Sequence, residues 1–180
     1  MTRPDPQTLA SKLCLACAMC CDGSIYKVAI AKDDETDRAA SHGFRLTIAS
    51  DGRQAFELPC HYLEGTACAR YQEWRPSTCG KFRCSTQIQA LEGTISEDQA
   101  LARIASALAV RAQILPMLEP GQTMCDARVR FDVLAKQHTT LSREDAAFTV
   151  RMFAFERMLD AHFREEGQAR LPSGTDRPSS

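Results

Sequence analysis

Clustered cysteines constrain this chain more than any other feature of its sequence. Eight of the nine cysteines lie between residues 14 and 84, and the first four form the run Cys-x-x-Cys-x-x-Cys-Cys. Such a concentration of thiols either binds metal or cross-links the chain, so the fold must bring distant segments together. The eight candidate metal ligands are Cys14, Cys17, Cys20, Cys21, Cys60, Cys68, Cys79 and Cys84.

The expected compartment decides between metal and disulfides. The N-terminus shows no apolar core of a signal peptide, and no stretch approaches the roughly 18 apolar residues of a membrane span. We therefore expect a cytoplasmic protein without membrane contact. In a reducing compartment clustered cysteines are metal-binding or catalytic more often than disulfide-bonded. The odd number of cysteines also fits a full disulfide framework poorly.

Charge and size narrow the function classes further. The formal net charge is −1 and the pI is about 6.4, so neither nucleic acid nor an anionic membrane is an expected partner. With 180 residues and 44% apolar residues, the chain is long enough to bury a core. A protein partner or substrate and the oligomeric state stay open.

The pattern of apolar, polar and turn residues along the chain predicts an α+β fold. A small Cys-rich part with short strands and loops is followed by a helical part. Alternating apolar residues predict strands over 24–31 and 44–48, and Asp51-Gly52 predicts a hairpin turn before a strand over 54–58. We expect an N-terminal arm over 1–13, a Cys-rich metal-binding region over 14–95, a helical region packed on it over 96–166, and a disordered tail over 167–180.

Short helices are predicted over 8–13, over 33–42 before Gly43, and over 87–91 before Gly93. Three capping boxes predict the longer helices. The boxes pair Ser96 with Gln99, Thr123 with Asp126, and Ser142 with Asp145, and Pro116 ends the first of these helices. The apolar stripes are Val129, Val133 and Leu134 in the second, and Phe148, Met152, Phe155 and Leu159 in the third, which runs to about Gly167.

Cysteine spacing carries the chemistry. Two residues between cysteines let the chain turn and aim both thiolates at one ion, at Zn–S distances of about 2.3 Å. A further step supplies three thiolates in one compact loop, a spacing similar to iron–sulfur proteins in which a remote cysteine completes the set. We therefore expect the eight sulfurs to converge in space. Two sites of four cysteines, or one multinuclear site with spare thiols, both fit.

The adjacent pair Cys20 and Cys21 bears on which metal is bound. The side chains of adjacent residues diverge, so we do not expect the two thiols to share one ion. Either they bind different metals, or one is a ligand while the other hydrogen-bonds to the site or is a reactive thiol. The predicted cofactor is an iron–sulfur cluster or zinc. The pair favours the cluster, because a closed zinc tetrahedron has no use for an extra thiol.

Other residues near the cysteines are weaker candidates. Arg75, Lys81 and Arg83 could donate hydrogen bonds to sulfur and compensate the thiolate charge. His61 follows Cys60 but reads as a surface histidine, because the thiols already suffice. Cys125 lies on a predicted helix well away from the cluster and reads as a buried hydrophobe. No role is assigned to His42, His138 and His162.

The ordered motifs resemble the CxxCxxCC (YkgJ-like) family, whose members are described as zinc- or iron-chelating proteins. The resemblance rests on residues 14–21, 58–63, 68–79, 82–84 and 91–96, and covers roughly residues 14–110. It implies that these cysteines chelate metal. Ala18 stands where many members have glycine, and Gly80 where an arginine is usual. A flagellin lysine-N-methylase group is similar in its cysteine motif, but this chain has no glycine-rich cofactor loop between a strand and a helix.

Three functions compete at this point. The first is a metal-binding protein whose zinc or iron–sulfur centre is structural, or which stores or delivers zinc or iron. The second is an iron–sulfur redox or protein-modifying enzyme of the lysine-N-methylase kind. The third is a protein-interaction module stapled by zinc. The sequence leaves open whether the chain is an enzyme.

Overall fold

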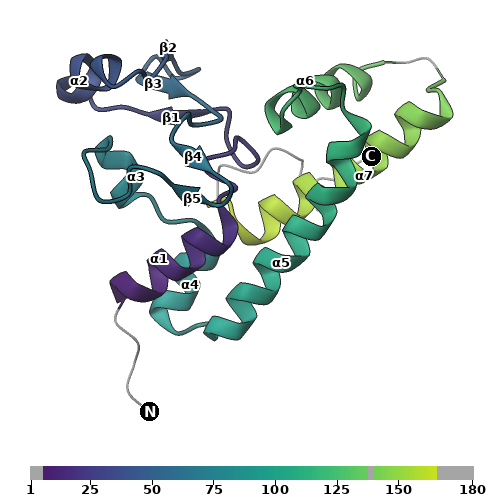
Figure 1. Cartoon of the computed structure of the whole chain (residues 1–180). Coiled ribbons are helices and arrows are strands. Elements are labelled where there is room, and N and C mark those ends of the chain that lie inside the picture. The colour runs from purple at the N-terminus through teal and green to yellow at the C-terminus, as the bar shows by residue number, and fades with distance from the viewer. Residues whose placement is uncertain (1–5, 138–139, 166–180) are drawn as a thin grey trace, which may run out of the picture.

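The helices carry most of the fold, and the strands all lie in the N-terminal half, so the α+β prediction is confirmed (Figure 1). The computed structural model describes residues 6–137 and 140–165. Its helices are α1 (Pro6–Cys17), α2 (Thr36–Ser41), α3 (Ser77–Lys81), α4 (Ser85–Glu92), α5 (Glu97–Ile114), α6 (Met124–Leu134) and α7 (Arg143–His162), with 3-10 turns η1 (Asp33–Glu35) and η2 (Leu115–Met117).

A three-stranded antiparallel sheet has the order β1-β3-β2. Its strands are β1 (Val28–Ile30), β2 (Leu46–Ile48) and β3 (Gln54–Glu57). The predicted hairpin is confirmed, with Thr47 opposite Ala55. The strand predicted over 24–31 is shorter, because residues 24–25 turn into the helical core instead. A second hairpin pairs β4 (Leu63–Glu64) with β5 (Ala67–Cys68).

Two apolar cores lie side by side. The smaller one supports the sheet and is built from Ala31, Ala39, Phe44, Phe56 and Leu58. The larger one joins α1 and α4–α7, and α5 packs along α7. The predicted stripe of α7 is confirmed, because Phe148, Met152, Phe155 and Leu159 are all fully buried.

The predicted helix starts are confirmed in detail. Ser96 Oγ accepts the backbone N–H of Gln99 at 3.1 Å, and Ser142 Oγ accepts that of Asp145 at 3.0 Å. Thr123 and Asp126 form the reciprocal capping box of α6. These caps satisfy N–H groups that the first turn of a helix leaves without partners.

The apolar stripe predicted for α6 is confirmed at Leu134, which is buried, and wrong at the two valines. Val129 and Val133 are 51% and 54% exposed, while Arg128 is buried beside Phe131. The reason is electrostatic, since Arg128 forms a buried ion pair with Glu156 of α7. A charged residue with such a partner can occupy a core position. Apolar spacing alone predicts only hydrophobic residues at such positions.

The N-terminal boundary also differs from the prediction. Helix α1 begins at Pro6 and runs through residue 13 to Cys17, with Leu9 and Leu13 buried in the larger core. Helices α1 and α4 therefore belong with α5–α7, and the helical part is not a separate stretch from residue 96 onward. The predicted tail over 167–180, the end of the helical region at 166 and His138 lie outside the described residues.

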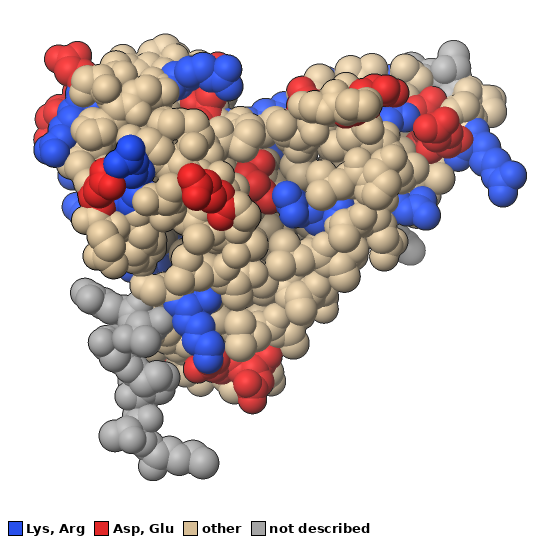
Figure 2. Space-filling view, viewed as in Figure 1, with Lys and Arg blue, Asp and Glu red and all other residues tan. Residues whose placement is uncertain are grey.

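One helical segment passes the length and composition test for a membrane span, contrary to the sequence expectation. It covers Glu97–Met117, has a mean hydropathy of 1.2, and is partly buried. Its buried positions Ala100, Ile104, Ala107 and Ile114 face the larger core. A core helix passes the same test, so this single segment is weak evidence for a span. Figure 2 shows acidic and basic side chains interspersed on the visible face.

Candidate metal centre

The cysteines lie where the two cores meet. Cys17 and Cys84 are buried in the larger core, and Cys20 packs against it. Cys60 packs against the smaller core under the sheet. Tyr26 contacts both cores. The fold thus brings cysteines separated by many residues to one junction.

Helix α1 supplies the first two cysteines, which differs from the compact loop that we expected. Cys14 and Cys17 stand one helical turn apart, so they share a face of α1. Ala18 then adopts φ 55°, a left-handed conformation that ends the helix, and its N–H bonds to the carbonyl of Cys14 at 2.9 Å. Cys20 and Cys21 follow in the turn beyond it.

Four thiols form a first set, Cys14, Cys17, Cys20 and Cys84. Burial raises the pKa of Cys17 to about 12, and the neighbouring thiols of Cys84 and Cys14 raise it further. Burial likewise raises the pKa of Cys20, with Cys84, Cys17 and Cys14 as its next strongest influences. Cys84 and Cys14 thus act on Cys17, and Cys84, Cys17 and Cys14 act on Cys20, on which Cys21 has a weaker influence.

The remaining four thiols form a second set, Cys21, Cys60, Cys68 and Cys79. Burial raises the pKa of Cys21 to about 12, and the thiols of Cys60, Cys79, Cys14 and Cys68 add to the shift, in that order. The pKa of Cys79 rises to about 12 through desolvation and then the thiol of Cys60, although this residue lies at the surface. The backbone N–H of Cys60 also donates to the carbonyl of Cys21 at 2.7 Å. The strongest neighbours of Cys20 and Cys21 therefore differ, while Cys14 acts on both thiols.

The sulfurs gather but do not form a closed ligand shell. Across residues 6–137 and 140–165, no group of three or more cysteine, histidine or acidic side chains has metal-holding geometry. All nine cysteines are free. The convergence of all eight sulfurs on metal stays a prediction.

Gln87 is a site residue that sequence reasoning missed. Its Nε2 donates to Cys14 Sγ at 3.0 Å and to the carbonyl of Ala10 at 2.9 Å. Its Oε1 accepts the N–H of Cys84 at 3.3 Å. The Cys84 side chain in turn accepts the backbone N–H of Gln87, which completes a capping box on α4. The available signal was glutamine three residues after a cysteine at a helix start.

The three basic residues expected near the thiols differ in whether they contact them. Burial raises the pKa of Cys14, and the charges of Arg83 and Arg75 oppose that rise, so both guanidinium groups lie near the thiols. Arg75 also stacks over the ring of Tyr71 at 4.2 Å. Lys81 is exposed and has no described contact with a thiol.

The histidines stand outside both sets. His61 is exposed, as expected of a surface residue, and its Nε2 lies 3.1 Å from the carbonyl of His42. His42 stacks on Trp74 with ring centroids 4.7 Å apart. His162 lies at the end of α7, where burial lowers its pKa. Neither His42 nor His61 is among the described neighbours of a thiol.

Cys125 lies closer to the cysteine motif than we expected. Its Sγ is 3.4 Å from the carbonyl of Leu58, and a Cβ placed on Gly23 would be 2.6 Å from that sulfur. Gly23 also has φ 82°, so both its conformation and its space require glycine. Cys125 is half-buried and packs between the segments that lead from Cys21 and into Cys60.

Comparisons of the chain with protein-family models, with curated proteins and with solved structures found no match. The resemblance to the CxxCxxCC family therefore stays a prediction that rests on the quoted motifs.

Proposed function

We propose that this protein binds metal on two adjacent thiolate centres. The first centre would use Cys14, Cys17, Cys20 and Cys84, and the second Cys21, Cys60, Cys68 and Cys79. The supporting observations are the strongest neighbours of the adjacent cysteines, which are Cys84 and Cys17 for Cys20 and are Cys60 and Cys79 for Cys21. The hydrogen bond from the N–H of Cys60 to the carbonyl of Cys21, at 2.7 Å, also brings these two cysteines together. Four thiolates are the complete ligand set of a structural zinc ion or of an iron–sulfur cluster.

The present sulfur positions are compatible with this proposal. A cysteine sulfur moves between staggered χ1 rotamers while its backbone stays in place. Metal binding would deprotonate the thiols and supply the positive charge that the buried sulfurs lack. Gln87, Arg75 and Arg83 would then donate to, or compensate, the thiolates of the two centres.

The metal is either zinc or iron in sulfide clusters, and each has one supporting observation. The spacing of Cys14, Cys17 and Cys20, completed by the remote Cys84, is similar to cluster-binding sequences. With Cys21 in the second set, no thiol of the eight is left over, which removes the argument against closed zinc tetrahedra. The shared chemistry is a thiophilic metal held by four thiolates. A cytoplasmic location remains part of the proposal.

The test is metal analysis of protein purified without oxygen, together with three matched cysteine variants. Cys84→Ser should remove the metal of the first centre and Cys60→Ser that of the second, while Cys125→Ser should retain both. Zinc gives a colourless protein with two ions per chain, and clusters give visible absorption that Cys84→Ser reduces. Protein without bound metal, or equal losses in all three variants, contradicts the proposal.

A further inference from the structure

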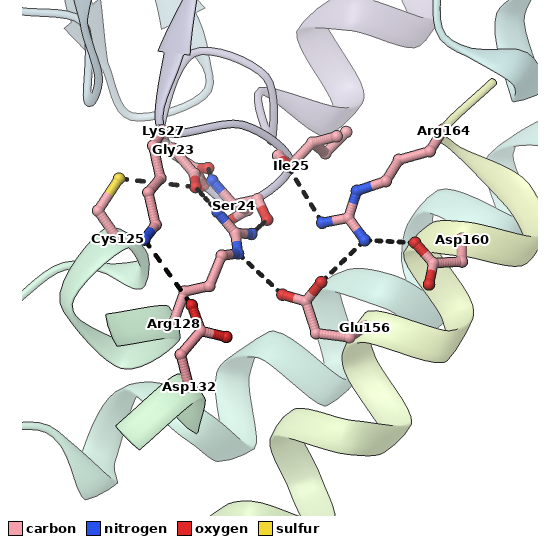
Figure 3. Close-up of polar contacts among 11 residues, drawn as sticks. Gly23, Ser24, Ile25, Lys27, Cys125, Arg128, Asp132, Glu156, Asp160 and Arg164 are labelled. Atoms are coloured by element: carbon pink, nitrogen blue, oxygen red, sulfur yellow. Dashed lines mark hydrogen bonds and ion pairs between the residues drawn. The ribbon is translucent and has the colours of Figure 1, made fainter. Parts of the chain in front are cut away.

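Three arginines from three different helical segments hold the loop that carries Cys20 and Cys21. The loop runs from Ala18 to Ile25 and is closed by the N–H of Ile25, which donates to the carbonyl of Met19 at 3.0 Å. Each arginine reaches a different part of it. Figure 3 shows two of them, Arg128 and Arg164, with the carboxylate of Glu156 between them.

Each of the three guanidinium nitrogens of Arg128, on α6, donates a hydrogen bond. Its Nε donates to Glu156 Oε1 at 2.8 Å, its Nη1 to the carbonyl of Gly23 at 3.0 Å, and its Nη2 to the carbonyl of Ser24 (Figure 3). The planar fork of arginine suits this arrangement, because a lysine offers no such fixed set of donors. The Arg128 side chain is only 1% exposed, so these bonds form away from water.

Arg164, just beyond α7, continues the arrangement along the loop. Its Nη2 donates to the carbonyl of Ile25 at 3.1 Å, and its Nη1 lies 2.8 Å from Glu156 Oε2 and 2.6 Å from Asp160 Oδ1. Two cations therefore face two carboxylates in one buried, charge-balanced network. The carbonyls of residues 23, 24 and 25 accept hydrogen bonds from the guanidinium groups of Arg128 and Arg164.

Arg111 of α5 contacts the same loop at Asp22. Its Nη2 lies 2.8 Å from Asp22 Oδ2, and Asp22 Oδ1 accepts the N–H of Ser24 at 2.7 Å. Asp22 directly follows Cys21. This contact is only partly buried, so it can be changed without opening the core.

We propose that Arg111, Arg128 and Arg164 form an arginine clamp that positions Cys20 and Cys21 for metal binding and couples metal occupancy to the packing of α5–α7. The inference rests on the proposed metal function. A buried ion pair is by itself weak evidence for stability. The inference of a positional role comes from the hydrogen bonds that Arg128 and Arg164 donate to three consecutive loop carbonyls. The clamped residues begin one position after the cysteine motif, and the two centres meet within that motif.

Two clamp variants and one control test this inference. Arg128→Lys keeps the charge but loses the fork, and Asp22→Asn weakens the partly exposed contact with Arg111. Arg130→Lys is the control, because Arg130 is on the same helix and pairs with Asp145 at 2.7 Å, away from the loop. All three are loaded with Zn²⁺, and separately with Co²⁺, whose absorption reports thiolate geometry.

Both clamp variants should lose Zn²⁺ to excess EDTA about 10–100-fold faster than the wild type, as expected when residues that orient metal ligands are removed. Their Co²⁺ absorption should shift, and the control should match the wild type in both readouts. Clamp variants with native circular dichroism that release Zn²⁺ at the wild-type rate overturn the inference. Should Arg128→Lys fail to fold, Asp22→Asn decides alone.

A metal-free readout separates this inference from the proposed function. Hydrogen exchange of the Ile25 amide in apo protein should be faster in both clamp variants and unchanged in Arg130→Lys. If the wild type binds no metal, the proposed function fails, and with it the metal-coupling part of this inference. The exchange experiment then decides whether the clamp still positions the loop, and equal exchange rates in all proteins refute that as well.

Discussion

At the scale of single residues, Gln87 shows how one polar side chain can organise two distant cysteines. It is buried, and its amide group reaches Cys14 on α1 while its carbonyl oxygen accepts from Cys84 at the start of α4. A buried amide without these partners would be destabilising, so the side chain holds the two helices in one relative position.

We expect Gln87→Met to weaken the first centre specifically. Methionine keeps the length of the side chain but donates no hydrogen bond to Cys14, so Zn²⁺ affinity at that centre should fall by about 10–100-fold. The measurement is competition with a chromophoric chelator. Gln89→Met is the matched control, since Gln89 bonds to Ser85 and Arg103 instead of a thiol. Equal affinities in both variants would show that Gln87 only packs.

The raised thiol pKa values predict how the metal-free protein responds to pH. The pKa of Cys17 is 9.0 in the absence of the fold and about 12 within it, because burial disfavours the thiolate. The folded state therefore keeps a proton that the unfolded state releases above pH 9. Stability conferred by this group is complete below pH 9 and is lost between pH 9 and about 12.

Urea denaturation of apo protein at several pH values checks this expectation. The free energy of unfolding should fall by about 1 kcal/mol per pH unit for one such thiol once the pH passes 9. Other alkaline groups also titrate in this window, so Cys17→Ser is the necessary comparison. Its slope should be shallower by that amount, and an identical slope in both proteins would refute the prediction.

At the scale of elements, helix α6 depends on its cap to present Arg128 to the loop. Thr123 Oγ1 and N–H both donate to Asp126 Oδ2 at 2.7 Å, which also lowers the pKa of that carboxyl group. The helix has eleven residues and its outward face carries exposed valines, so packing alone supports only one side of it.

Thr123→Ala should lower the free energy of unfolding by about 1 kcal/mol, the usual effect of losing an N-cap. Val129→Ala on the exposed face should change it by less than about 0.5 kcal/mol. Chemical denaturation followed by circular dichroism measures both. A larger loss for Val129→Ala than for Thr123→Ala would mean that a partner or a second copy covers this face.

Local signals made the elements predictable, and the site was predictable only in part. The caps at Ser96, Thr123 and Ser142, and the stripe beginning at Phe148, depend on neighbours in the sequence, and all of them hold. The roles of three polar residues depend on partners many residues away in the sequence: Gln87, Arg128 and Glu156. Without knowledge of those partners, polar side chains are predicted to lie at the surface. Adjacent side chains diverge, so the sequence already allowed Cys20 and Cys21 to serve different metals. Which cysteines neighbour each of them depends on the course of the chain after Ala18, which residue types alone do not specify.

At the scale of the whole molecule, the two cores predict unequal dependence on metal. The larger core contains fully buried side chains from α5 and α7, whereas the segment from Cys60 to Cys79 contributes few buried residues. Metal binding can contribute roughly 10–16 kcal/mol in small structural sites. We therefore expect the metal to support the Cys-rich part much more than the contact between α5 and α7.

Hydrogen exchange before and after chelation tests this expectation. Chelation should remove most protection from residues 60–79 and reduce it elsewhere between 14 and 84, while α5 and α7 remain protected. Helix α6 should lose some protection, because coupling between two sites is reciprocal. Full protection across residues 14–84 in the apo protein would contradict the expectation.

The contact between Tyr26 and Phe82 has a topological consequence. Their ring centroids are 5.5 Å apart, and the two residues mark where the chain leaves the larger core and where it returns. Residues 27–81 thus form an excursion that starts and ends at one point, between α1 and α4. Units whose two ends lie close together are the ones that hosts accept as insertions. The strand-bearing part thus has the neighbouring ends of an inserted unit, and it lies beside the helices, which contact it again at Leu58 and Tyr71 (Figure 1).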